Sequence, residues 1–168
     1  QWNFHGLQQI HSSDWCEFSH ESQESIERKA DAQYTFLSHE ALYIRTADCI
    51  PLLLIQGSFT AAVHVGWKGL VNGILLNIPK FLQSNLTQAF IGPHIQVTSF
   101  EVGKDIKKHF VRMAQLTHLK EEEYIFPHKN KDKVYVHLAC LVEALLQSLG
   151  ISVLFQSAED TFRSSEYF

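Results

Sequence analysis

A carboxylate, a thiol and an imidazole lie close together in one apolar stretch of the chain, residues 44–69. Asp48 and Cys49 stand just before the first of two apolar segments, and His64 lies near the end of the second. Zinc binds thiolate and imidazole readily, and three protein ligands with an open fourth position are typical of catalytic zinc. These residue types predict a metal site whose third ligand comes from elsewhere in the chain.

The residue types alone leave the third ligand and the chemistry open. The candidate third ligands are other histidines, His5, His11, His94 and His137. Alternatively, Cys49 is a buried apolar thiol and His64 a core imidazole bonded to the backbone, since buried cysteine is common. A further alternative is a metal-free hydrolase in which Cys49 is the nucleophile and His64 its base.

Two strands are expected to position Cys49 and His64. The apolar segments Leu52–Ile55 and Thr60–Val65 flank turn residues at 56–58, which is the pattern of a β-hairpin. Their continuous Leu, Ile and Val content predicts that both faces of the sheet are covered. A proline two residues after Cys49 predicts a bend at the entrance to the first strand.

The register of this hairpin decides whether Cys49 and His64 can meet. A two-residue turn at 57–58 places Gln56 opposite Phe59. Pro51 then lies opposite His64, and Cys49 is diagonal to His64 on the same face, at ~7–8 Å between Cα atoms. A turn one residue longer would reverse this parity.

Composition and length describe an ordinary globular protein. The chain has 168 residues, of which 45% are hydrophobic and 19% charged, and we expect a single domain over residues 1–168. A net charge of -4 without a basic stripe argues against a nucleic-acid partner. We expect no membrane contact and a cytoplasmic location, because no signal peptide or long apolar run is present. Three cysteines form no disulfide framework, which favours a reducing compartment.

The rest of the pattern mixes strands and helices without strict βαβ alternation. It predicts an α/β fold with mixed sheets and flanking helices. The expected strands are 7–11, 30–35, 41–46, 88–91 and 151–155; the expected helices are 69–82 (kinked or ended early by Pro79), 103–113 and 136–149; the expected loops are 12–28 and 120–133.

Trp67 and Lys68 lie between the end of the second strand and the start of the expected helix. A helix start attracts anions, so Lys68 is predicted to help bind a phosphate or carboxylate, the alternative being a solvated lysine. Trp67 either stacks on a purine or packs in the core. Asp48 either orients a metal ligand or caps a turn. The chain has no P-loop, no G-x-S-x-G elbow and no zinc base-deaminase signature.

Several segments carry motifs of one known family. They are T-A-D-C-I-P-L-L at 46–53, A-A-V-H-V-G-W-K-G-L at 61–70, I-G-P-H-I at 91–95, F-E-V-G at 100–103, Q-Q-I-H at 8–11, A-D-A at 30–32 and K-V-Y-V-H-L at 133–138. They resemble the YfiH family, whose members are called laccase-domain or polyphenol oxidase proteins and also purine nucleoside phosphorylases. The resemblance covers the whole chain and implies a YfiH-like fold. It also implies a zinc site of His11, Cys49 and His64, and so favours His11 among the candidates.

The resemblance implies a zinc-dependent purine nucleoside phosphorylase that acts on adenosine, inosine and methylthioadenosine with phosphate, and that also has adenosine deaminase activity. Cys49, His64 and Asp48 would then be catalytic, and Lys68 and Trp67 would bind substrate. The alternatives are a copper-dependent, laccase-like polyphenol oxidase and a non-catalytic factor in the editing of cell-wall precursors.

The chain departs from the family pattern at several positions. Ser12 stands where a glycine is usual, Lys68 where arginine is more frequent, His137 where Asp is frequent, and Asp160-Thr161 where many members have Cys-Thr. The family usually has a further N-terminal stretch with an Asn-Arg motif and a C-terminal Ser-Tyr-Arg segment. Because these arginines are candidate anion binders, the resemblance implies that part of the substrate site lies outside residues 1–168.

Overall fold

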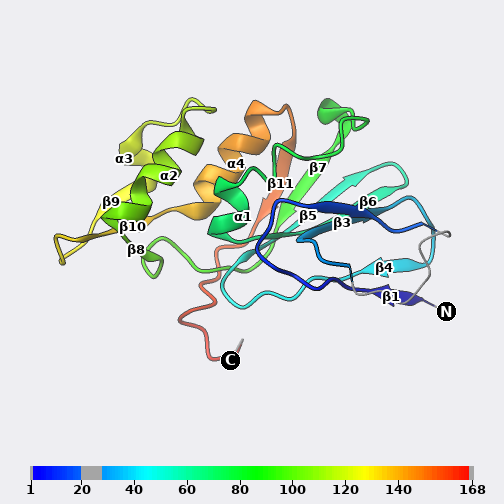
Figure 1. Cartoon of the computed structure of the whole chain (residues 1–168), viewed down its shortest axis with the longest axis horizontal. Coiled ribbons are helices and arrows are strands. Elements are labelled where there is room, and N and C mark those ends of the chain that lie inside the picture. Colours follow the sequence, from blue (N-terminus) through cyan, green and yellow to red (C-terminus); the bar gives the residue numbers. More distant parts are fainter. Residues whose placement is uncertain (1, 20–27, 167–168) are drawn as a thin grey trace.

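The computed structural model describes residues 2–19 and 28–166 (Figure 1). Its strands are β1 (Asn3–His5), β2 (Trp15–Glu17), β3 (Ala32–Thr35), β4 (Glu40–Leu42), β5 (Ile50–Gln56), β6 (Phe59–Val65), β7 (Gln88–Ile91), β8 (Glu101–Gly103), β9 (Ile125–Pro127), β10 (Lys133–Val136) and β11 (Ser152–Gln156). Its helices are α1 (Trp67–Val71), the 3-10 helix η2 (Ser84–Leu86), α2 (Lys104–Ala114), α3 (Glu121–Tyr124) and α4 (Leu138–Ser148).

The strands form three sheets. The largest is mixed, with the order β11-β7-β5-β6-β3-β2, and smaller sheets pair β8-β10-β9 and β1-β4. Helices α2, α3 and α4 lie beside the β8-β10-β9 sheet, and α4 also contacts β11 (Figure 1). This is the predicted α/β fold of mixed sheets with flanking helices. None of the described helices combines the length and the apolar character that crossing a membrane requires.

The hairpin of β5 and β6 has the predicted register. Gln56 pairs with Phe59 and Pro51 pairs with His64. The turn between them is two residues long, and Gly57 has a φ of 58°, a left-handed conformation that glycine adopts without steric cost. His64 is therefore fixed opposite Pro51, two residues after Cys49.

The prediction that both faces of this hairpin are covered is wrong for β5. Leu52 and Leu54 are fully buried, whereas Leu53 and Ile55 are 46% and 37% exposed. β5 pairs in antiparallel fashion with both β6 and β7, and antiparallel sheets commonly leave one face to solvent. The core lies on the other face, where β5 and β6 pack together with the apolar sides of α2 and α4.

The helix predicted over 69–82 is also wrong in extent. α1 ends at Val71, and Gly73 has a φ of 90°, which an α-helix cannot continue through. Ile74 and Leu75 are still fully buried. The apolar spacing therefore marks residues that are buried in turns, and it does not mark a continuous helix. The helix predicted over 103–113 is confirmed as α2, and the one over 136–149 is confirmed as α4, which begins after the residues of β10.

Some short strands and loops differ from expectation. No strand covers 7–11, because His11 has a φ of 58° that is incompatible with extended backbone. The expected loop at 12–28 contains β2, and its residues 20–27 lie outside the described part of the chain. The expected loop at 120–133 contains α3 and β9, and the strand at 41–46 stops at Leu42. The strands expected at 30–35, 88–91 and 151–155 are confirmed with small shifts of their ends.

Candidate metal site

Three side chains from separate parts of the chain meet at the base of the β5–β6 hairpin. The ligand atoms of His11, Cys49 and His64 all lie within 4.8 Å of one another, and Cys49 Sγ is 3.9 Å from His11 Nε2. Tetrahedral zinc, with bonds of about 2.0–2.3 Å, needs ligand atoms about 3.3–3.6 Å apart. Small side-chain movements would therefore close the cluster around an ion. Within the described residues, no other group of three His, Cys, Asp or Glu side chains converges in this way.

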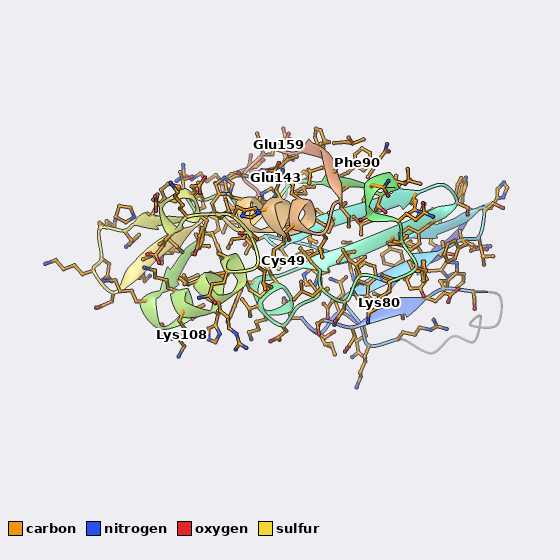
Figure 2. The ribbon with its side chains drawn as sticks, turned by 90° about the horizontal axis from the view of Figure 1, so that it is seen from above. Cys49, Lys80, Phe90, Lys108, Glu143 and Glu159 are labelled. Atoms are coloured by element: carbon orange, nitrogen blue, oxygen red, sulfur yellow. The ribbon has the colours of Figure 1, made fainter. Side chains whose placement is uncertain are left out.

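The cluster lies at the surface but has a buried floor. His64, on β6, is 4% exposed, Cys49 in the bend before β5 is half-buried, and His11 is exposed. In Figure 2 Cys49 lies near the middle of the molecule's length, between the half that carries Lys108 and the half that carries Lys80. The exposed side gives a fourth ligand or a substrate access to the cluster.

A buried carboxylate, Asp31, lies behind the cluster. Its Oδ1 is 2.8 Å from His64 Nδ1, so the other ring nitrogen, Nε2, is the one left for a metal. The carboxylate also accepts hydrogen bonds from the backbone amides of Ile10, His11 and Ser12 and from the Ser12 hydroxyl. Burial alone would raise the pKa of Asp31, but the hydrogen bonds from His64, Ser12 and Ile10 bring that pKa below its usual value. Asp31 is thus an ionised, fully bonded partner of the site.

Sequence reasoning singled out A-D-A at 30–32 only as a family motif and gave Asp31 no role. The signal that could have found it is an acidic residue between two alanines at the start of an expected strand, since a carboxylate buried there must be hydrogen-bonded. Its partners come from residues 10–12 and 64, and no local spacing indicates that pairing.

Gly66 leaves the space that the cluster occupies. A Cβ at this position would lie 2.9 Å from His11 Cδ2 and 3.1 Å from Cys49 Sγ. Both distances are closer than ordinary van der Waals contact. The glycine of the H-V-G-W segment therefore permits the approach of His11 to Cys49.

The Cys49 thiol is protonated at neutral pH when no cation is present. Burial, followed by the negative charges of Asp48 and Asp31, raises the pKa of Cys49 to about 11. A metal ion would oppose all of these effects, because it binds the thiolate form. The local electrostatics suit a cation better than a free nucleophilic thiolate.

The other histidines considered as third ligands are engaged elsewhere. His5 Nε2 is 2.6 Å from Glu40 Oε2, next to the β1-β4 pair. His137 is the N-cap of α4, where its Nδ1 accepts a hydrogen bond from the Cys140 amide. Burial lowers the pKa of His137, and the nearby His94 lowers it further. His137 therefore has a structural role as a helix cap.

His94 is buried and uses both ring nitrogens. Its Nδ1 is 2.7 Å from the Gly92 carbonyl oxygen, and its Nε2 is 3.1 Å from Gln96 Nε2. Burial lowers the pKa of His94, so the ring is neutral, with Nδ1 donating and Nε2 accepting. This histidine holds a loop and offers no atom to a metal.

Asp48 stands outside the three-residue cluster. Its Oδ1 accepts a hydrogen bond from Thr161 Oγ1 at 3.0 Å, and its backbone carbonyl accepts one from the Ile95 amide. These bonds join the bend before β5 to the chain after β7 and to residue 161. Asp48 thus positions the segment that carries Cys49.

The expected anion site at Lys68 loses its main support. α1 is five residues long, too short to build a significant helix dipole, and Lys68 is exposed with its Nζ 5.8 Å from the Trp67 ring centroid. Trp67 is half-buried and packs 6.3 Å, centroid to centroid, from Phe110 of α2. Lys68 is thus an exposed residue two positions after Gly66, and the half-buried Trp67 packs against the core.

The fold and the cluster define a class of protein, a mixed α/β fold with a His-Cys-His site at the base of its central hairpin. A family model described as multi-copper polyphenol oxidoreductase laccase matches residues 1–168. The chain belongs to this family, which includes the YfiH proteins.

Known relatives agree with this assignment. The chain is 30% identical over 166 residues to a purine nucleoside phosphorylase of Haemophilus influenzae, and 28% identical to purine nucleoside phosphorylase YfiH of Escherichia coli. Each alignment covers 96% of this chain but 66% and 65% of the relatives' lengths, respectively. The chain thus spans just under two thirds of these relatives.

Solved structures share the fold. A Neisseria meningitidis protein of the DUF152 family superposes with a TM-score of 0.86 at 26% identity, over 99% of this chain and 68% of that protein. The YfiH protein of Bacillus licheniformis gives a TM-score of 0.82 at 21% identity, over 98% of this chain and 67% of its own length. The second likeness concerns the fold alone.

Proposed function

We propose that this chain carries the metal site of a zinc-dependent purine nucleoside phosphorylase acting on adenosine, inosine and methylthioadenosine. The observation that carries the proposal is the convergence of His11, Cys49 and His64, in which Asp31 holds Nδ1 of His64. One thiolate and two imidazoles with an open side suit catalytic zinc. The names of the relatives, purine nucleoside phosphorylases, supply the substrate class.

Zinc held by these three residues would supply a Lewis acid and a bound water whose pKa falls to about 7. The chain's own residues prepare the site for it. Asp31 holds the His64 proton on Nδ1, and Gly66 leaves room for His11 beside Cys49. Cys49 gives up its proton when the cation binds. The same site would serve adenosine deamination, which we propose as a second activity.

Three side chains outside the metal cluster are proposed to bind the substrate or handle its proton. Lys68, exposed two residues after Gly66, attracts the phosphate, and the solvent-facing part of the half-buried Trp67 contacts the purine. Asp48, held by Thr161 next to Cys49, handles a proton or orients the segment that carries the thiol. Three free thiols fit a cytoplasmic setting.

The test is release of free purine base from each nucleoside in the presence of phosphate, with inosine formation followed in parallel to detect deamination. Cys49→Ala and His64→Ala should lower both activities at least 100-fold if the metal supplies the chemistry. Cys140→Ala is the matched control, because Cys140 is a half-buried free thiol outside the cluster. Full activity in the Cys49 and His64 variants would refute the metal-dependent mechanism.

A copper-dependent polyphenol oxidase is the second candidate, and the description of the family model favours it. One Cys and two His also suit copper, but the described residues hold one cluster, and a multi-copper centre needs more ligands. Metal analysis of protein produced without added copper separates the two. Stoichiometric zinc supports the phosphorylase, whereas copper uptake with oxygen-dependent phenol oxidation supports the oxidase.

A further inference from the structure

We infer that Asp31 is the positioning residue of this site and that it sets two of the three metal ligands before any metal binds. The inference rests on the proposed metal site but not on the nucleoside reaction. Asp31 has no side-chain exposure and stands directly before β3, which pairs with β6. Its carboxylate contacts the ring of His64 and the backbone amide of His11.

The bond to His64 selects the tautomer of the ring. Asp31 Oδ1 lies 2.8 Å from His64 Nδ1, and the Asp31 carbonyl accepts the His64 backbone amide at 2.7 Å. Both Asp31 oxygens already accept from backbone amides, which can only donate, so the side chain is an acceptor and Nδ1 must carry the proton. Nε2 is then the ring nitrogen left to face the cluster, the arrangement common in metal-binding histidines.

The bonds to residues 10–12 set the position of His11. The amides of Ile10, His11 and Ser12 all donate to the two carboxylate oxygens, at 3.2 Å and 3.0 Å for the first two. Successive amides converging on one anion form a nest, which requires a left-handed residue, and His11 has a φ of 58°. A non-glycine residue adopts this conformation only where neighbouring contacts hold it.

Asp31 therefore joins two segments that are distant in the sequence. If an amide nitrogen replaces one of its oxygens, the three amides and the His64 ring must share a single acceptor; His11 can then leave the left-handed conformation, and the His64 ring can take the other tautomer. Cys49 is held independently, because its bend is fixed by Asp48 and the start of β5. Loss of Asp31 should thus weaken two metal bonds and leave the third intact.

The first test needs no substitution. Long-range nitrogen NMR of the metal-free protein should show His64 as the single Nδ1–H tautomer, and the amides of residues 10–12 should be protected from hydrogen exchange. A His64 ring with the proton on Nε2, or unprotected amides at 10–12 before metal is added, would overturn the inference.

The second test measures zinc affinity by competition with a chromophoric chelator. Asp31→Asn should weaken binding about 10–100-fold, the range found for outer-shell partners of metal ligands. Asp160→Asn is the matched control, because Asp160 also accepts from a serine hydroxyl and a backbone amide but touches no ligand of the cluster. Its zinc affinity should equal that of the unsubstituted chain. Equal affinity in Asp31→Asn would overturn the inference.

Ser12→Ala keeps the inference testable if Asp31→Asn does not fold. It removes one side-chain donor to Asp31 and leaves the carboxylate, so the His64 tautomer should be unchanged while hydrogen exchange at 10–12 accelerates. Unchanged exchange would count against the nest. Zinc binding with the expected tautomer but no release of purine base would refute the proposed function and leave the role of Asp31 standing.

Discussion

Two buried histidines lie near the bend that carries Cys49, and their surroundings differ. His64 is 4% exposed and stands opposite Pro51 on β6, whereas His94 is 1% exposed and directly precedes Ile95, whose amide bonds to Asp48. Each ring has its Nδ1 engaged. His64 gives Nδ1 to a carboxylate and keeps Nε2 for the cluster, but His94 gives Nδ1 to a carbonyl and Nε2 to Gln96. Both rings are buried, so burial does not distinguish a candidate ligand from a structural histidine. The difference is whether Nε2 is hydrogen-bonded within the loop or left to face the cluster.

Asp31, near His64, and Asp160, near His94, differ in the same way: one contacts a candidate ligand and the other does not. Asp31 bonds to residues 10–12 and to His64, so it joins backbone to a ligand. Asp160 accepts from Ser99 Oγ at 2.6 Å and from the Gln96 amide at 3.2 Å, so it joins two loops. Both neighbourhoods are polar, but only the first directs a free lone pair toward the other candidate ligands.

The sharpest way to break this comparison is to exchange the two histidines for residues that bind no metal. His64→Ala should lower zinc affinity by more than the ~10–100-fold expected for an outer-shell change, because it removes a ligand. His94→Gln should leave the zinc stoichiometry unchanged and affect stability instead. Elemental analysis of purified, dialysed protein gives the measurement, with thermal unfolding run on the same samples. Loss of zinc in His94→Gln would place that histidine in the site.

Two glycines offer a second comparison, with smaller expected effects. A Cβ on Gly66 would press on His11 and Cys49, whereas a Cβ on Gly92 would lie 2.8 Å from Pro51 Cγ. Gly66→Ala should therefore weaken zinc binding several-fold or more, and Gly92→Ala should mainly lower the free energy of unfolding by about 1–3 kcal/mol, as overpacking does. Chelator competition and urea unfolding measure the two effects. A Gly66→Ala variant with full zinc affinity would show that the cluster does not depend on the space at this position.

Much of the scaffold that carries these regions follows from local patterns. The two-residue turn at 57–58 sets the pairing of Pro51 with His64, and the apolar spacing of 103–113 identifies α2. The apolar spacing of 69–82 misleads, because Gly73 interrupts the helix while burial of the same apolar residues continues through turns. Periodicity reports which residues are buried, and it does not report a backbone break.

The site itself is less accessible to sequence reasoning. Cys49 and His64 could be paired from the hairpin, but the residue types left four histidines open as the third ligand, and only the family resemblance favoured His11. The decisive contacts are between Asp31 and the amides of residues 10–12, which carry no side-chain signature. The left-handed backbone of His11 is likewise invisible in its residue type. Long-range backbone contacts of this kind require the folded structure.

The smallest effect that separates the two histidine regions is the pH dependence of stability. Burial lowers the pKa of His94 in the folded state, so below the unfolded value of about 6.5 the unfolded chain binds more protons at this residue. Stability contributed by neutral His94 is therefore present above pH 6.5 and is lost as the pH falls, by up to about 1.4 kcal/mol per pH unit. His94→Gln removes this contribution and keeps a polar group in the loop.

Urea unfolding from pH 7.5 to 5.0, with chelator present throughout so that metal release adds nothing, should thus give a flatter profile for His94→Gln than for the unsubstituted chain. His137 remains in both proteins, and burial also lowers its pKa, so some acid sensitivity should persist in the variant. Parallel profiles would mean that His94 is protonated as readily in the folded protein as in the unfolded chain. The contrast with His64 would then have to rest on hydrogen-bond geometry alone.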